Sequence, residues 1–139
     1  SMSARQDDNR RIGEIWHVIQ QLKRRMAEGG VTQESFLYPR NAQEEMVVDG
    51  LLYSLYRITE EATSLSDRTK IEFPDIPWDA VRGVRNRLAH DYPGTDHESI
   101  WQSLNNDLDA LESVCADYAA RRDLDIEELA TPDTPLGKA

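Results

Sequence analysis

Most of the side chains that could do chemistry lie in one stretch of eleven residues. Between residues 82 and 92, an otherwise acidic chain carries three arginines, a histidine and a tyrosine. Arginine presents a fixed fork of N–H donors that matches a phosphate group. Histidine has an ordinary pKa of about 6.5, so it can donate or accept a proton at neutral pH. The stretch is therefore the candidate active site, in which an arginine such as Arg85 could bind a phosphate and His90 could transfer a proton.

Helical geometry limits how these two side chains can act together. At about 100° per residue, Val81, Val84 and Leu88 share one face, as in a helix packed on a core. Arg85 flanks that face, whereas His90 would project about 140° away from Arg85 on a straight helix. Two arrangements would bring such groups to one ligand. Either the helix ends or bends before His90, or a second chain brings its own copy of the motif alongside.

Residues 85–92 resemble the signature of the HEPN superfamily and, within it, the HepT-like ribonuclease toxins. In that signature an arginine, usually followed by a polar residue such as Asn86, precedes a histidine by four to six positions. In the HepT-like branch a tyrosine follows the histidine after one further residue, where this chain has Tyr92. The similarity extends from about residue 33 to residue 118. It includes Ile58-Thr59-Glu60, which is similar to a family stretch that contributes a polar residue facing the site.

The resemblance implies a metal-independent endoribonuclease that is the toxin of a toxin–antitoxin pair. Arg85 would hold the scissile phosphate, His90 would act as general acid or base, and Asn86 and Glu60 would support them. A homodimer would supply two histidines to one site. The resemblance also implies a nucleotidyltransferase antitoxin that attaches AMP to Tyr92. RNA would be the substrate, and no cofactor or metal is implied.

A second interpretation is a non-catalytic helical dimer that binds a nucleotidyltransferase partner or a nucleotide. From spacing alone, an arginine and a histidine in a helical bundle are more often structural than catalytic, and Tyr92 could simply cover the edge of the core. By composition, Glu60 would be an ordinary solvated acid. The intact set of Arg85, His90 and Tyr92 favours the enzyme.

Apolar residues recur at helical spacing, which predicts an all-α, up-and-down bundle of four main helices. The helices are expected over residues 8–28, 41–65, 78–90 and 96–118. A short extra turn is expected near Phe36, and Thr95 with Glu98 forms a predicted capping box for the last helix. Residues 66–78 contain prolines and polar residues, so an irregular connection is expected there.

A length of 139 residues, with 39% apolar and 30% charged residues, indicates one domain with a single core. We expect this bundle over residues 1–122, followed by a mobile acidic tail over residues 123–139. Met2 is the expected native start. The single cysteine, Cys115, is expected to be an inert core thiol.

The net charge of −10 opposes broad, non-specific affinity for nucleic acid. However, residues 79–95 sum to +1, so the predicted site is an exception to the acidic average. No ligand spacing typical of a metal site is present. No apolar run approaches the ~20 residues that span a bilayer, and no signal sequence is evident, which predicts a cytoplasmic protein.

Overall fold

The computed structural model describes residues 2–90 and 96–129, and every regular element in these ranges is helical. The longer helices are α1 (Met2–Glu28), α3 (Ala42–Thr63), α5 (Trp78–His90) and α7 (Leu108–Arg121). The shorter elements are α2 (Gln33–Leu37), α4 (Asp67–Glu72), α6 (His97–Gln102), the π-helical segment η2 (Ser103–Asp107) and α8 (Ile126–Leu129). The predicted all-α fold is confirmed. None of the described helices is long and apolar enough to cross a membrane.

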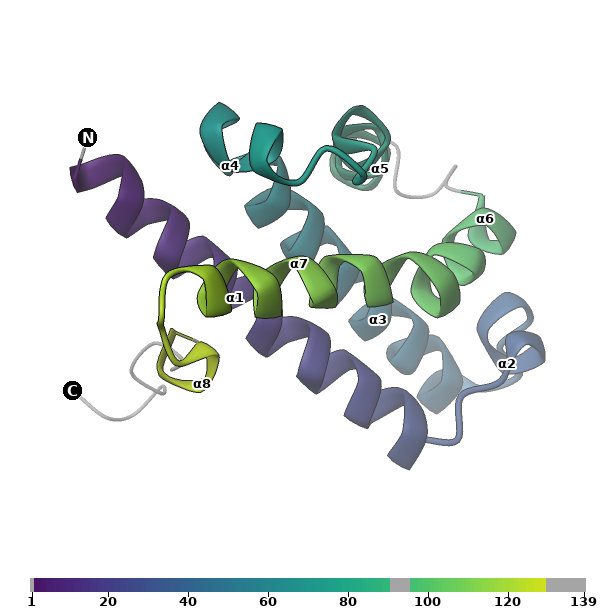
Figure 1. Ribbon diagram of the computed structural model, residues 1–139. Helices are drawn as coiled ribbons and strands as arrows, with labels where there is room; N and C mark the ends of the chain where they lie inside the picture. The colour runs from purple at the N-terminus through teal and green to yellow at the C-terminus, as the bar shows by residue number, and fades with distance from the viewer. Residues whose placement is uncertain (1, 91–95, 130–139) are drawn as a thin grey trace, which may run out of the picture.

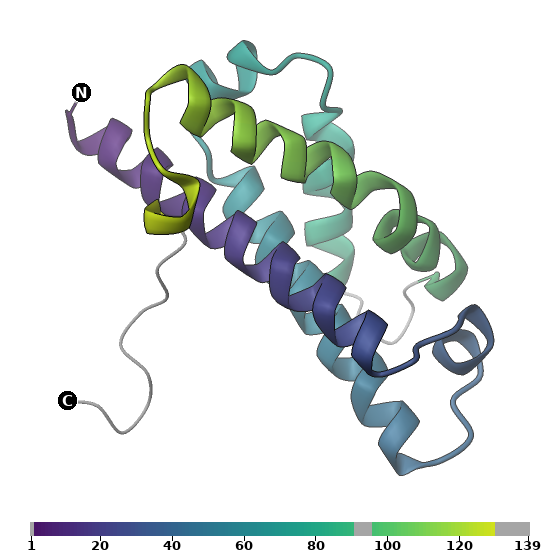
Figure 2. The same cartoon turned by 60° about the horizontal axis from the view of Figure 1, so that its bottom comes forward.

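The bundle is built on the antiparallel pair of α1 and α3, which lie side by side along most of their length (Figures 1 and 2). Helix α5 packs on α3, and α7 lies across α1 at an angle. The apolar residues predicted to share one side of each helix meet in a single core. Its largest fully buried side chains include Ile12, Ile15, Ile19, Leu22, Leu52, Ile58, Leu108 and Tyr118.

Two smaller predictions about the core are also confirmed. The extra turn near Phe36 is α2, and Phe36 is 1% exposed, with its ring centroid 5.3 Å from that of Trp101. Cys115 is buried, and burial raises the pKa of its thiol to about 12. The thiol is therefore protonated and unreactive at neutral pH.

The expectation of an irregular connection over residues 66–78 is wrong in part, because α4 lies within it. Ser66 caps this helix by accepting a hydrogen bond from the Thr69 N–H. Six residues carry too little apolar periodicity to be recognised in sequence. Helix α1 begins at Met2 rather than at the predicted Asp8. The prediction missed its first turns because they are polar and carry no apolar face.

The last predicted helix is interrupted rather than continuous. Its N-cap is Asp96, whose carboxylate accepts hydrogen bonds from the Glu98 and Ser99 N–H groups, so the prediction of Thr95 as cap is wrong. The π-helical segment η2 separates α6 from α7, and it still buries Leu104. Thr95 itself lies outside the described residues.

Helical structure continues beyond the predicted domain boundary at residue 122. Helix α8 contacts α1 and α7, and Ile126 packs against the core. Residues 130–139 lie outside the described part of the chain, so the mobility of the tail stays a prediction.

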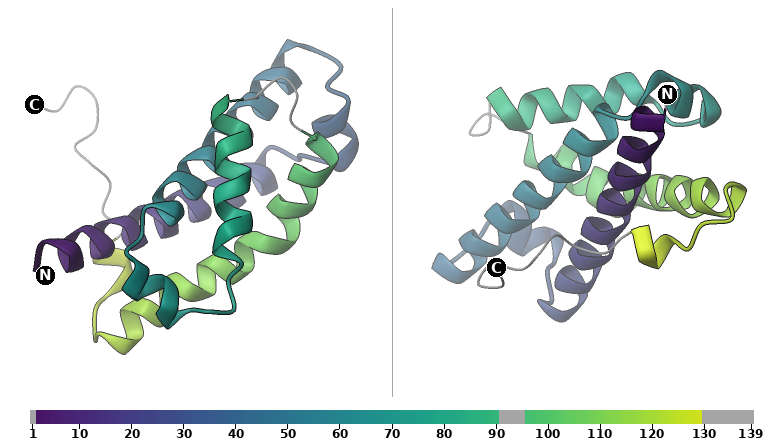
Figure 3. Two further views of the ribbon diagram at one scale, coloured as in Figure 1. Left: turned by 90° about the horizontal axis from the view of Figure 1, so that it is seen from above. Right: turned by 90° about the vertical axis from the view of Figure 1, so that its left-hand side faces the viewer.

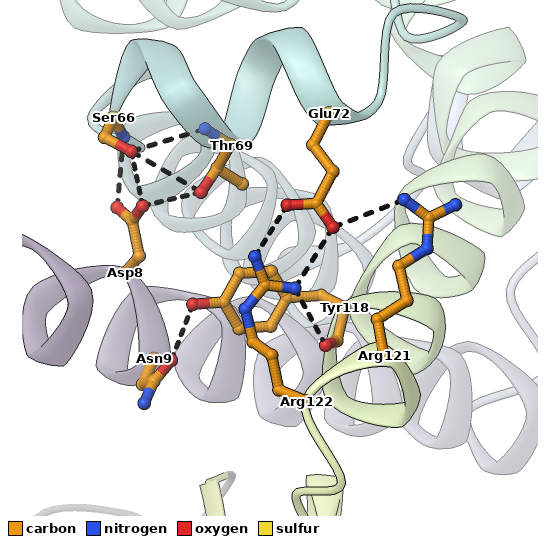
Figure 4. A network of polar contacts seen from close by, with 8 residues as sticks. All are labelled: Asp8, Asn9, Ser66, Thr69, Glu72, Tyr118, Arg121 and Arg122. Carbon is orange, nitrogen blue, oxygen red and sulfur yellow. Dashed lines mark hydrogen bonds and ion pairs between the residues drawn. The ribbon is translucent and has the colours of Figure 1, made fainter.

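Asp8 of α1 is 6% exposed and ties α1 to the start of α4 (Figure 4). Its carboxylate accepts hydrogen bonds from the Ser66 N–H at 3.0 Å, the Ser66 hydroxyl at 2.5 Å and the Thr69 hydroxyl at 2.6 Å. Burial alone would raise the pKa of Asp8, but these hydrogen bonds outweigh it and the pKa is lowered. The charged carboxylate is therefore the form that holds α4 in place.

Replacing Asp8 by asparagine should lower the free energy of unfolding by about 1.5–3 kcal/mol at pH 7, since a buried charged acceptor is lost. Because the folded-state pKa of Asp8 lies below its ordinary value of 3.8, its contribution is complete above that pH and is lost as the pH falls through the folded-state pKa. Urea unfolding of wild type and Asp8→Asn at pH 7 and at pH 2.5 measures the free energy of unfolding of both proteins and its dependence on pH. Asp7→Asn, at an exposed neighbouring position, is the control; equal losses for both variants would contradict the assignment.

Candidate active site

Helix α5 carries the predicted motif, and its beginning is anchored by Trp78. The indole Nε1 of Trp78 donates hydrogen bonds to the carbonyl oxygens of Lys70 at 3.1 Å and Phe73 at 3.0 Å. Further along, Leu88 is 5% exposed, and Val81 and Val84 pack against the core. The face predicted from their spacing is therefore the one that α5 buries.

This orientation brings Arg85 of α5 to Glu60 of α3. The Arg85 Nε donates a hydrogen bond to Glu60 Oε2 at 2.5 Å, and Nη2 approaches Oε1 at 3.5 Å. The Arg85 Nη1 donates to the Asn86 side-chain oxygen at 2.9 Å. Helices α3 and α5 are neighbours in the bundle (Figure 3). Arg85 and Asn86 of α5 thus form one cluster with Glu60 of α3.

The cluster keeps Arg85 charged and leaves part of its guanidinium open. The hydrogen bond to Glu60 raises the pKa of Arg85, so the side chain is a permanent cation. A guanidinium has five N–H donors, and the three contacts above use three of them. The side chain is 31% exposed. Within residues 2–90 and 96–129, two donors therefore stay available for an oxygen anion that approaches from solvent.

His90 is the last residue of α5, and its side chain is exposed. Within residues 2–90 and 96–129, it makes no hydrogen bond or ion pair. Helix α5 includes His90, so it does not end before that residue. On an ideal helix, two side chains five residues apart would project about 140° from one another. Tyr92 lies outside the described residues.

The other basic and histidine side chains near the motif are engaged elsewhere or lie apart. Arg82 forms an ion pair with Asp79 at 2.9 Å, and Arg87 is exposed. The ring of His97 lies 5.9 Å from that of Phe36. In the described part of the chain, no three His, Cys, Asp or Glu side chains are placed to hold a metal ion.

Comparison with known proteins identifies the family of the chain. A model of the family described as "Ribonuclease HepT-like" matches residues 13–117, which is most of the chain. The chain belongs to the HepT-like ribonuclease family. The match runs from α1 into α7 and includes Glu60, Arg85, Asn86 and His90.

Curated relatives carry ribonuclease names. The chain is 25% identical over 75 residues to "Putative RNase MJ1380" of Methanocaldococcus jannaschii, covering 54% of this chain and 69% of the relative. It is 27% identical over 79 residues to "Probable ribonuclease HepT" of Thermococcus cleftensis, covering 57% of this chain and 67% of the relative. No solved structure matches the chain significantly.

One residue beside the HepT-like motif was not predicted. Tyr56 lies one turn before Glu60 on α3, and its interaction with Arg85 contributes to the raised pKa of the arginine. The four-residue spacing from Glu60 places both side chains on one face of α3, which is a signal present in the sequence.

Proposed function

We propose that this HepT-like protein is a metal-independent endoribonuclease that acts in the cytoplasm as the toxin of a toxin–antitoxin pair. One observation carries the proposal: Glu60 of α3 orients the guanidinium of Arg85. Arg85 lies on the same helix, α5, as the exposed His90. Arginine, a polar neighbour and histidine at this spacing, in a chain of a ribonuclease family, supply the groups that RNA cleavage needs.

In the proposed reaction the substrate's own 2′-hydroxyl is the nucleophile. His90 removes its proton, the 2′-oxygen bonds to phosphorus, and the bond from phosphorus to the 5′-oxygen breaks. A second histidine gives a proton to the leaving 5′-oxygen. The products are a 2′,3′-cyclic phosphate and a 5′-hydroxyl, and the charge on the phosphate oxygens is neutralised by Arg85.

Glu60 acts in this scheme as a positioning residue. Its side chain is 35% exposed, so its ion pair with Arg85 is screened by solvent and is worth little stability. The pair can therefore admit a phosphate without a large loss. Glu60 holds the Arg85 guanidinium against α3 through its hydrogen bond with Nε. The N–H donors that Glu60 does not bind can then contact the phosphate.

The site is proposed to be completed by a second copy of the chain. Because α5 is continuous through His90, Arg85 and His90 of one chain diverge. A two-fold axis near the end of α5 would bring the motifs of both chains together and supply both proton-transfer groups.

The purified protein should cleave single-stranded RNA in the presence of EDTA and leave 2′,3′-cyclic phosphate ends. His90→Ala should lower kcat by about 10²–10⁴-fold, the contribution of one general acid–base group. Arg85→Lys should also lose activity, because a point charge does not reproduce the arginine fork. Gel analysis of labelled RNA measures the rates, and mass spectrometry identifies the ends.

His97→Ala is the matched control for that assay, because it removes a histidine of α6 outside the motif. Glu60→Gln keeps the size of the side chain and should lower activity less than Arg85→Lys. Activity that persists in His90→Ala would favour the second interpretation, a non-catalytic dimer that binds a nucleotidyltransferase or a nucleotide.

Light scattering at micromolar concentration should give twice the chain mass of 15.9 kDa. The shared site requires this assembly, since each chain supplies one motif histidine. A monomer that cleaves RNA at full rate would show that one chain is sufficient and would reject the two-fold site.

A nucleotidyltransferase antitoxin is the proposed partner, and Tyr92 is the proposed site of its AMP transfer. Tyr92 stands two residues after His90 in the sequence. An AMP group on Tyr92 would add bulk and negative phosphate where the RNA phosphate has to bind, so steric exclusion and charge repulsion would both inhibit cleavage.

Tyr92→Phe should therefore cleave RNA at close to the wild-type rate and resist inhibition by the nucleotidyltransferase with ATP. The substitution keeps the ring and removes only the hydroxyl that would accept AMP. Intact-mass measurement should show the added AMP on wild type and not on the variant. If Tyr92→Phe were as inactive as His90→Ala, Tyr92 would belong to the catalytic machinery.

A further inference from the structure

A cavity lies away from Arg85, where the beginning of α1, helix α4 and the end of α7 meet (Figure 4). Its volume is about 760 Å³, within the range of about 300–1,000 Å³ typical of small-molecule sites. Phe73 and Trp78 connect this region to the first turn of α5. His90 is at the other end of α5, about 18 Å along the helix axis.

One side of the cavity is fixed by a closed set of polar contacts. Arg122 binds Glu72 through both terminal nitrogens, at 2.6 and 3.1 Å, and its guanidinium carbon lies 3.6 Å from the centre of the Tyr118 ring. The Tyr118 hydroxyl donates to the Asn9 side-chain oxygen at 2.5 Å. Glu72 has a lowered pKa, caused first by its hydrogen bond with Arg122, so it is charged at neutral pH. These groups form a rigid wall and have little capacity left for a ligand.

Three other arginines line the same cavity with unused donors. Arg5 and Arg68 are exposed and make no hydrogen bond or ion pair with any residue of the described ranges. Arg121 contacts Glu72 through Nη1 at 3.3 Å, and its other nitrogens have no protein partner among the described residues (Figure 4). They come from α1, from α4 and from the end of α7, so the fold gathers them from distant parts of the sequence.

The charge balance at this cavity is the reverse of that of the chain. The lining contains four arginines and two carboxylates, Asp8 and Glu72, whereas the whole chain has 16 basic and 26 acidic residues. The carboxylate of Asp8 is occupied by hydrogen bonds from Ser66 and Thr69. Among the described residues that line it, the cavity therefore carries an excess of positive charge.

The aromatic rings beside the cavity are covered, which limits the kind of ligand. Phe73 is 7% exposed and lies under the Arg121 guanidinium, at 4.6 Å from ring centre to guanidinium carbon. Tyr118 is 2% exposed and lies under Arg122. Neither ring offers a face on which a nucleobase could stack, so recognition would depend on anionic oxygens alone.

We propose that this cavity is a second anion site, which binds phosphate groups through Arg5, Arg68 and Arg121 without recognising a base. The phosphates come either from a free oligophosphate, such as the triphosphate of a nucleotide, or from the backbone of an RNA strand. The inference does not depend on the proposed ribonuclease activity, because it concerns binding at the opposite end of α5.

Binding to the full-length protein is measured by calorimetry with three probes: inorganic tripolyphosphate, ATP, and a 2′-O-methyl RNA oligomer that cannot be cleaved by 2′-hydroxyl attack. The variant combines Arg5→Gln with Arg68→Gln, since neither arginine supports a described contact of the fold. The control combines Arg24→Gln with Arg25→Gln, which removes the same charge from exposed positions about 30 Å away along α1.

The Arg5/Arg68 variant should bind the phosphate probe at least about tenfold more weakly than wild type, while the control changes little. Thermal unfolding should show that both double variants are folded and that the probe stabilises wild type but not the Arg5/Arg68 variant. If tripolyphosphate and ATP bind with similar affinity, the ligand is a free oligophosphate. If only the RNA probe binds, the ligand is the phosphate backbone of an RNA strand. If no probe binds wild type, or if both double variants lose affinity equally, the proposal is wrong.

RNA cleavage by the same variants separates this inference from the proposed function. The Arg5/Arg68 variant should retain kcat on a dinucleotide substrate too short to reach the second site. A failure of His90→Ala to reduce cleavage would overturn the proposed chemistry and leave the binding result unaffected.

Discussion

The packing of α5 on α3 is the contact on which the candidate site depends. It buries Leu88 and half-buries Val81 and Val84, and this fixes the rotation of α5 about its axis. That rotation places Arg85 against Glu60, although 24 residues separate them in the chain. The ion pair is partly exposed and adds little stability. The buried apolar face of α5 therefore stabilises the contact with α3, and it determines where Arg85 and Glu60 meet.

The same rotation has a consequence for the number of chains in the site. A helix that is continuous through His90 turns that side chain away from Arg85. Helix α5 runs to His90, its last residue. In the proposed reaction, the motif of a second chain would therefore complete the site.

Charge is distributed so that the two ends of α5 have different environments. At Arg85 a carboxylate and an amide orient a single cation. At the other end, arginines from three helices surround a cavity in which only two of the lining residues are acidic. A chain with a net charge of −10 repels a polyanion at long range. Both proposed phosphate sites are local exceptions to this average: Arg85 is a cation held by Glu60 and Asn86, and the arginines that line the cavity outnumber its acids.

The sequence by itself determined the helical class, the faces that α3, α5 and α7 bury, and the positions of Arg85, Asn86 and His90 on one helix, because these follow from local periodicity. It also supported the family, through the spacing of the motif. By composition Glu60 and Glu61 would both be solvated acids, and the family resemblance singled out Glu60. The contact itself is a result of the tertiary structure: Glu60 reaches Arg85, whereas Glu61 binds Arg11. Helix α4 and the gathering of Arg5, Arg68 and Arg121 also required the structure, because Asp8 joins α1 to α4 across 58 residues of chain. Contacts between distant segments leave no period in a sequence, so periodicity could not reveal them.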